Sequence, residues 1–318
     1  MRLLNTSTLE LQFFNSPEAV EDGYVALSHV WNEREDSFQD LQRYHNESQA
    51  GKRPHDRVSE KIRMCCEVAA KDGHKWVWID TCCIDKTSSA ELTEAINSMF
   101  RYYALSKLCY AFLRDVPTEA FHDRSSASFE NSEWHRRGWT LQELVAPRTV
   151  LFLSSSWECV GSKADLAEEL ERITSIPSGI LRLELRPTDM SIAQRMSWAA
   201  RRQTTRTEDE AYCLLGIFDI TMPTLYGEGR KAFRRLQEEI MKVSPDTTLF
   251  AWGSIGSMQE VVHHFPDDQG LNAPLFAISP RDYQASGNVK WYHPTTMSGE
   301  NTSPEASYHQ TLNMCDVD

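Results

Sequence analysis

Acidic side chains that directly follow apolar runs are the residues of this sequence best placed to form a ligand site. Asp80 ends the apolar run of residues 75–79, which predicts a buried strand, and a turn at residues 80–85 follows it. A second apolar run covers residues 108–113, and a polar loop then leads to residues 136–144, which include Glu143. In open α/β sheets, ligands bind beyond the carboxyl ends of the strands. The sequence therefore predicts a site at that edge.

Glu143 also fits a purely structural role. Residues 140–143 read Thr-Leu-Gln-Glu, a capping box in which the glutamate accepts a hydrogen bond from the backbone N–H of Thr140. Trp139 before the cap and Leu144 after it would form the accompanying hydrophobic staple. Such a cap contributes about 1 kcal/mol and needs no catalysis. Two roles stay open for Glu143: a helix cap, or a carboxylate that faces a cleft.

The sequence gives little support for a cysteine nucleophile, a zinc site or a dinucleotide-binding glycine motif. The adjacent pair Cys82 and Cys83 has no histidine nearby in sequence, so a cysteine nucleophile is not favoured. The eight cysteines include no C-x-x-C pair with zinc spacing, and we interpret them as reduced thiols, several of them in the core. Residues 227–232 fit G-x-G-x-x-A, but Pro223 precedes them and no clear strand leads in, so they predict the entry to a helix.

The composition is that of an ordinary soluble protein with an acidic surface. The 318 residues are 41% hydrophobic and carry a net charge of -13, which argues against general binding to nucleic acid or to anionic membranes. The Arg-rich stretch 201–206 is a local exception, and its simplest interpretation is a solvated helix end. The first 20 residues lack a secretory signal, and no window reaches the roughly 18 apolar residues that span a bilayer. We therefore expect a cytoplasmic protein without a membrane span.

The hydrophobic pattern predicts an α/β core. Strands are expected at residues 24–28, 76–79, 108–113 and 149–153, with helices between them at about 59–71 and 89–103, which is the order of parallel crossover units. Residues 3–4 and 11–14 predict an edge hairpin, and residues 117–133 a loop. A helix is expected from 162 to about 173. We place the core at about 20–160, a helical part at about 161–253, and a partly irregular or disordered extension at 254–318.

Six blocks of this sequence together resemble the fungal heterokaryon-incompatibility (HET) domain. They occur in the family's order and cover roughly residues 20–253, and each is long enough to make chance agreement improbable. The blocks are residues 24–31 (YVALSHVW), 78–86 (WIDTCCIDK), 137–147 (RGWTLQELVAP), 193–199 (AQRMSWA), 208–218 (EDEAYCLLGIF) and 225–229 (LYGEG).

The resemblance implies a fungal protein of self/non-self recognition whose activation leads to cell death. HET domains in turn look like remote relatives of TIR domains, which implies a TIR-like (flavodoxin-like) parallel sheet flanked by helices, here with an added helical C-terminal half. On that pattern, residues 139–144 resemble the TIR motif Trp-Cys-x-x-Glu-Leu, with Thr140 in place of the cysteine. In enzymatic TIR domains this glutamate cleaves NAD, and the position corresponds to Glu143. NAD would be the substrate, and no cofactor is implied.

Cleavage of the nicotinamide–ribose bond builds positive charge on the ribose, as glycoside hydrolysis does. A carboxylate close to the ribose stabilises that charge, and nicotinamide leaves without a general acid. On these grounds Glu143 is the candidate catalytic residue. The candidates for substrate binding are Ser28, Trp31, Arg34, Asp80, Arg137 and Trp139.

Each of these candidates has a structural alternative. Trp31 could stack on a nucleobase or nicotinamide, or fill a core or lid position. Asp80 could hold a ribose hydroxyl, or act as a turn or cap acid. Arg34 and Arg137 could meet phosphates, or point into solvent. Trp139 fits the hydrophobic staple better than a ligand contact.

Two main functions of different kinds therefore remain, together with one lesser alternative. The first is an NAD-cleaving effector, an NAD glycohydrolase, with Glu143 catalytic. The second is a non-enzymatic signalling module that works by assembling with partners, and a lesser third is a pseudoenzyme that binds a nucleotide without cleaving it. The resemblance also implies self-association on activation and an upstream sensor protein.

Overall fold

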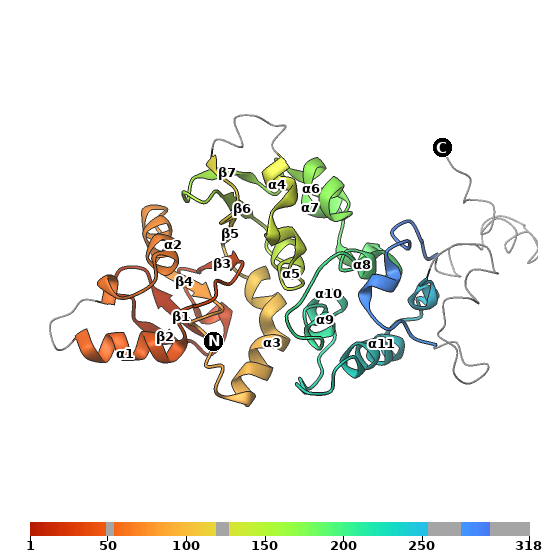
Figure 1. The fold of residues 1–318 in the computed structure, drawn as a ribbon, viewed down its shortest axis with the longest axis horizontal. Helices are drawn as coiled ribbons and strands as arrows, with labels where there is room; N and C mark the ends of the chain where they lie inside the picture. Colours follow the sequence, from red (N-terminus) through yellow and green to blue (C-terminus); the bar gives the residue numbers. More distant parts are fainter. Residues whose placement is uncertain (49–53, 119–126, 254–274, 293–318) are drawn as a thin grey trace, which may run out of the picture.

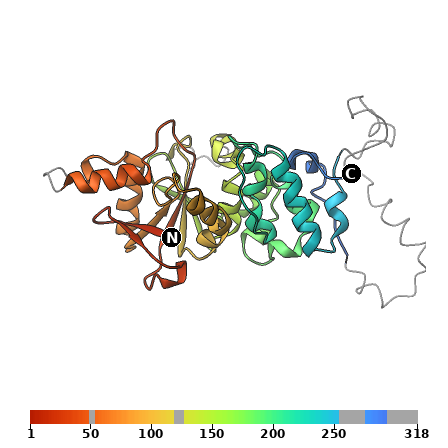
Figure 2. The same ribbon diagram turned by 90° about the horizontal axis from the view of Figure 1, so that it is seen from below.

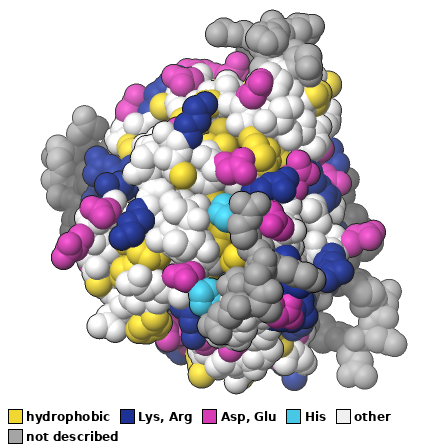
Figure 3. Space-filling view, turned by 90° about the vertical axis from the view of Figure 1, so that its left-hand side faces the viewer, with side chains coloured by type: hydrophobic (Ala, Val, Ile, Leu, Met, Phe, Trp, Pro, Cys, Tyr) yellow, Lys and Arg dark blue, Asp and Glu magenta, His cyan; other side chains and the backbone are white. Residues whose placement is uncertain are grey.

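The computed structural model describes residues 1–48, 54–118, 127–253 and 275–292, and it is built around one seven-stranded sheet. The sheet occupies one end of an elongated molecule, and a group of short helices occupies the other (Figures 1 and 2). On the face at the sheet end, basic and acidic side chains are interspersed (Figure 3). Among the described residues, no helix is long and apolar enough to span a membrane.

Four parallel strands form the centre of the sheet. Across the sheet the order is β2-β1-β4-β3-β5-β6-β7, and the neighbours β4, β3, β5 and β6 run parallel while the outer pairs are antiparallel. The bounds are β1 Arg2–Asn5, β2 Leu11–Phe13, β3 Val25–His29, β4 Trp76–Ile79, β5 Leu108–Phe112, β6 Val150–Leu153 and β7 Cys159–Ser162. The predicted α/β class, the four parallel strands and the edge hairpin are confirmed.

Strand β3 lies where the chain changes direction across the sheet. The connection from β3 through α1 (Phe38–Ser48) and α2 (Glu60–Lys71) leads to β4 on one side. The chain then crosses back through α3 (Ser89–Ala104) to β5 on the other side of β3, and continues outward to β6. A crevice opens between the carboxyl ends of β3 and β5, because the connections that leave these two strands run in opposite directions across the sheet. The fold therefore places the residues after β3 and β4 at the position where open α/β sheets bind ligands.

Two predictions between residues 117 and 173 are wrong. Part of the predicted loop is helical, in α4 (Ala127–Asn131) and a 3₁₀ helix (Glu133–Arg136), while residues 119–126 lie outside the described residues. The helix expected from residue 162 begins later, as α6 (Ala167–Thr174), since residues 159–162 form the edge strand β7. That strand is short and contains Gly161, so it lacks the alternation that identifies strands.

The second half of the chain packs onto the sheet half through α3. Its helices are α7 Ser178–Leu181, α8 Ile192–Ser197, α9 Asp209–Tyr212, α10 Leu215–Phe218 and α11 Lys231–Val243. Helix α10 lies against α3, where a Cβ added at Gly216 would come within 2.0 Å of the Phe100 side chain. Only glycine permits this close approach, so the apolar core is continuous between the halves.

Part of the predicted C-terminal extension is ordered against the helical half. The Gln237 side chain of α11 exchanges two hydrogen bonds with the backbone of Ala277, at 2.9 and 3.0 Å. Tyr283, in the 3₁₀ helix Pro280–Tyr283, is fully buried beside it. Residues 275–292 are thus packed in place with a mostly irregular backbone, apart from this 3₁₀ helix, and the rest of 254–318 lies outside the described residues. All seven described cysteines are free, and six are buried, as expected for core thiols.

Candidate functional site

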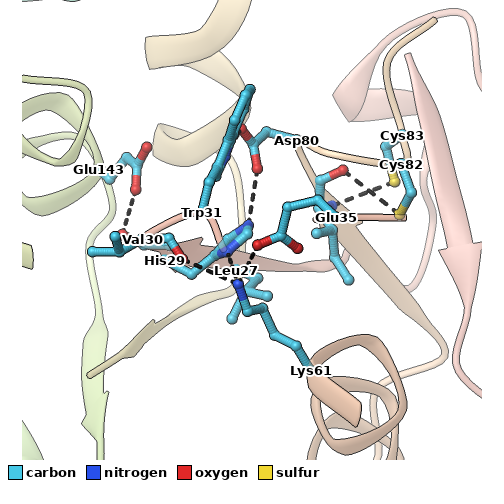
Figure 4. A network of polar contacts seen from close by, with 12 residues as sticks. Leu27, His29, Val30, Trp31, Glu35, Lys61, Asp80, Cys82, Cys83 and Glu143 are labelled. Atoms are coloured by element: carbon cyan, nitrogen blue, oxygen red, sulfur yellow. Dashed lines mark hydrogen bonds and ion pairs between the residues drawn. The ribbon is translucent and has the colours of Figure 1, made fainter. Parts of the chain in front are cut away.

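Two neighbouring residues at the end of β3 direct polar side chains to opposite faces of the sheet. All five residues of this strand are buried, and successive side chains of a strand alternate between its faces. Ser28 points toward α5 (Thr140–Val145) and hydrogen-bonds to Glu143, whereas His29 points toward α2 and contacts Lys61. The carboxyl end of β3 thus joins two polar networks (Figure 4).

The network on the α2 side is a chain of charged groups. Lys61 Nζ donates to Glu35 at 2.5 Å, to the Val30 carbonyl at 3.0 Å and to His29 Nδ1 at 3.0 Å. An ammonium group can only donate, so Nδ1 accepts and the ring proton is on Nε2, which donates to Asp80 Oδ1 at 3.0 Å. Lys61 therefore determines which imidazole nitrogen carries the proton.

Asp80 follows β4 directly and is held as a carboxylate. Burial acts to raise its pKa, but the hydrogen bond from His29 and the charges of Lys86 and Arg137 outweigh burial, so the pKa lies below its usual value. The indole Nε1 of Trp31 donates to its other oxygen at 2.9 Å. The position that was predicted to bind a ribose hydroxyl is thus already hydrogen-bonded within the protein.

Trp31 lies between cations and carboxylates. Lys86 Nζ is 3.8 Å from the centroid of the indole ring and Arg137 Cζ is 5.4 Å from it. The side chain is 40% exposed, and Figure 4 shows its ring standing between Glu143 and Asp80. The described cavities, of about 10, 60 and 290 Å³, are lined by other residues. Seen in the view of Figure 4, the Trp31 ring separates the two acids.

Glu143 is a buried carboxyl on the other face. It is 6% exposed and accepts a hydrogen bond from Ser28 Oγ, which itself accepts one from Trp134 Nε1 at 2.7 Å. Burial, reinforced by the negative charge of Asp80, raises the pKa of Glu143 to about 8, although Ser28 and Arg137 act in the opposite direction. A neutral acid thus lies close to an ionised one, a pairing typical of acid–base sites.

The predicted capping box at residues 140–143 is wrong. Helix α5 begins at Thr140 with Trp139 in the cap position, and no side-chain cap hydrogen bond is made. The Thr140 hydroxyl lies 2.6 Å from the Trp134 carbonyl and 2.9 Å from that of Arg137, so it donates away from the helix. Because the Glu143 carboxyl is engaged by Ser28, it does not reach back to the Thr140 N–H.

Five of the seven predicted site residues come together and two do not. Ser28, Trp31, Asp80, Arg137 and Glu143 form one cluster. Arg34 is exposed, and its charge acts on Asp40 in α1. Trp139 interacts with Asp209 in α9 and so belongs to the contact with the helical half.

Sequence reasoning missed the supporting residues His29, Glu35, Lys61, Lys86 and Trp134. His29 and Lys86 lie inside blocks that carry the family resemblance, so that resemblance was the available signal. Lys61 gave none, because its partners Glu35 and His29 are 26 and 32 residues away. Among the described residues, no group of three or more His, Cys, Asp or Glu side chains could hold a metal ion.

Replacing Lys61 with methionine is expected to lower the free energy of unfolding by about 3 kcal/mol, because the change leaves Glu35 buried without its counter-charge. The two side chains are 5% and 11% exposed. Adding Glu35→Gln to Lys61→Met should recover about 1 kcal/mol, measured by urea unfolding at pH 7. A double variant no more stable than Lys61→Met would show that the pair is not coupled.

Comparisons with known proteins give two family matches and one relative. Residues 24–128 match the family described as heterokaryon incompatibility protein (HET), and residues 231–312 match a domain of unknown function, DUF8212. Over 226 residues the chain is 44% identical to the vegetative incompatibility protein HET-E-1 of Podospora anserina; the alignment covers 69% of this chain but only 16% of that protein. No solved structure gives a significant match.

Proposed function

We propose that this chain, which matches the heterokaryon incompatibility domain, acts in fungal self/non-self recognition as an effector of cell death. The relative is named as a vegetative incompatibility protein. Because the alignment covers only 16% of that protein, the proposal concerns the role of the aligned domain in this chain. Membership in this family suggests the recognition process, and the site chemistry suggests how the effector acts.

The reaction we propose is hydrolysis of NAD at the nicotinamide–ribose bond. The observation that carries it is the orientation of Glu143: its carboxyl leaves its own helix uncapped and faces Ser28 at the carboxyl end of β3. A carboxyl held there, with its pKa raised to about 8, is costly for stability and suited to chemistry.

The sheet order agrees with a TIR-like fold for this domain. Along the chain the four parallel strands are β3, β4, β5 and β6. Across the sheet they lie in the order second, first, third, fourth, which is the start of the flavodoxin-like arrangement. In that arrangement, ligands bind where the order reverses, and here that point is the end of β3. The glutamate of the TIR-like motif, Glu143, lies beside it.

The chemistry balances with water as the only co-reactant. The bond between the ribose and the nicotinamide nitrogen breaks, and its electron pair leaves with neutral nicotinamide. Ionised Glu143 stabilises the positive charge left on the ribose, water adds to that carbon, and one proton is released. The positive charge of the nicotinamide ring favours the ionised form of Glu143, because an opposite charge lowers a carboxyl pKa.

The neighbouring residues suit the rest of the substrate. Lys86 and Arg137 are cations at the edge of the cluster, where a pyrophosphate could bind. Asp80 could accept a ribose hydroxyl in place of the indole N–H of Trp31. Since Trp31 stands between the two acids, substrate entry requires this side chain to move, and self-association on activation is a means of moving it.

One observation favours the non-enzymatic alternative. Glu143 is only 6% exposed, and Trp31 occupies the space beside it, so this conformation offers a ribose no direct access. A domain that remained in this state would act through assembly with partners, and the buried acids would only shape the fold.

The direct test is release of nicotinamide from NAD by the purified chain over a range of protein concentrations, with the oligomeric state measured in the same samples by light scattering. We expect release that increases more than linearly with protein concentration as assemblies form. No release from a demonstrated assembly would contradict the enzymatic proposal and support the assembly module.

A further inference from the structure

A cavity of about 60 Å³ lies on the helical side of the molecule, away from Glu143 and Asp80. Its walls come from the end of α6, the end of α8, the 3₁₀ helix before α5 and the ordered segment 275–292. Seven polar side chains line it: His135, Thr174, Ser175, Ser197, Arg201, Arg202 and Gln284. No carboxylate does. Because a water molecule requires roughly 15 Å³ of such volume, the cavity has room for about four waters or one tetrahedral ion.

His135 is a buried polar group without a hydrogen-bond partner at this cavity. The side chain is 6% exposed, and neither ring nitrogen makes a hydrogen bond within the described residues, although the backbone of Phe129 lies near the ring. Edge contacts with the rings of Phe129 and Trp134, at centroid distances of 5.0 and 5.3 Å, fix its orientation. Burial and the charge of Arg202 lower its pKa to about 3, so the neutral ring offers one N–H donor.

Arg202 brings a positive charge to the same cavity. It is 7% exposed and donates to the backbone carbonyls of Trp198 and Arg137 and to Thr140 Oγ1, but its Nη2 has no partner among the described residues. Burial lowers its pKa to about 10, which leaves it charged at neutral pH. Arg202 also borders a second cavity of about 10 Å³ beside Glu210, with room for about one water. A buried guanidinium without a paired carboxylate favours an anion.

The remaining donors are also suited to an anion. Arg201 is exposed, and the described residues include no partner for its guanidinium. The hydroxyls of Thr174 and Ser197 donate to backbone carbonyls at 2.6 Å each and are not available. We assign Arg201, Arg202 and His135 as the donors to the anion, with Ser175 and Gln284 also in the lining. The two arginines account for part of the Arg-rich stretch that composition alone suggested was solvated.

We propose that this cavity binds one tetrahedral oxyanion, either free phosphate or the phosphate group of a monoester, held by His135, Arg201 and Arg202. The site is independent of NAD cleavage. It nevertheless lies near α5, because Arg202 donates to Thr140 Oγ1 at 2.9 Å and to the Arg137 carbonyl at 3.0 Å. An anion that fixes Arg202 would thereby steady the helix that carries Glu143.

The test is calorimetric titration of the full chain with inorganic phosphate and, separately, with methyl phosphate, at constant ionic strength set with chloride. We expect saturable binding to one site, and about a tenfold weaker affinity in Arg201→Gln, which corresponds to about 1.4 kcal/mol. Arg148→Gln is the matched control, since Arg148 is exposed and does not line the cavity. Phosphate should also move the ring-nitrogen signals of His135 in NMR spectra.

The two ligands distinguish the sources of the anion. Tighter binding of methyl phosphate would identify a phosphate ester as the occupant, and binding of phosphate alone would identify the free ion. Absence of heat beyond that of chloride would overturn the proposal. Equal weakening by Arg148→Gln and Arg201→Gln would overturn it as well, because the binding would then follow net charge.

Discussion

Exchanging Glu143 for glutamine is expected to lower kcat/KM for nicotinamide release by about 10³-fold or more. Glutamine has nearly the same size and can still accept a hydrogen bond from Ser28, which reaches Glu143 in the wild type. What it lacks is the negative charge that would stabilise the ribose cation. Measurement of nicotinamide release at pH 9, where wild-type Glu143 is mainly ionised, gives the largest contrast.

The pH dependence separates a catalytic Glu143 from a structural one. Because kcat/KM reports ionisations of the free enzyme, the wild-type value should increase about tenfold per pH unit below about 8 and level off above it. Glu184→Gln removes an exposed carboxyl outside the cluster and should leave the profile unchanged. Equal release by wild type and a folded Glu143→Gln protein would exclude Glu143 from the mechanism.

The parallel core could be predicted because its signals are local. Each central strand is an apolar run, as in residues 76–79, where every side chain is buried. The helix that begins at Ser89 has a side-chain cap, in which Ser88 accepts from the Glu91 N–H, as its spacing indicates. The strand at Cys159–Ser162 escaped prediction because pairing with β6 holds it, and a short run with a glycine shows no sign of that pairing.

The site was predictable only in part, because only some of its residues are marked by a local sequence pattern. The end of β3 identified Ser28 and Trp31, and the end of β4 identified Asp80, since strand ends can be read from hydrophobicity. The capping motif at Glu143 misled because a carboxyl satisfies whichever donor is better placed, and Ser28 lies 115 residues away in sequence. Distant partners of this kind are set by packing and leave no local pattern.

The cluster combines features that oppose each other energetically. Asp80 is stabilised as an anion by His29, Lys86 and Arg137, and that charge then makes ionisation of Glu143 harder. A protein selected for stability alone would gain by replacing one of the two acids with a neutral residue. Their joint presence is therefore best explained by a function that requires both, and the stability cost of ionising Glu143 should be measurable.

The same Glu143→Gln exchange is expected to stabilise the fold at alkaline pH. The folded-state pKa is raised from 4.5 to about 8, so the native protein binds one more proton than the unfolded chain between these values. Stability is full below about 4.5 and falls as pH rises, by about 1.4 kcal/mol per unit, until the folded pKa is passed. The variant lacks this loss, which amounts to at most about 5 kcal/mol above pH 8.

The measurement is the difference in unfolding free energy between variant and wild type, from urea titrations at pH 4.5, 6.5 and 8.5. The difference should be near zero at pH 4.5 and largest at pH 8.5, because other titrating groups are common to both proteins and cancel. Glu184→Gln should show no such trend. A difference independent of pH would mean that Glu143 ionises freely in the native state, and it would leave the buried carboxyl no more costly than an exposed one.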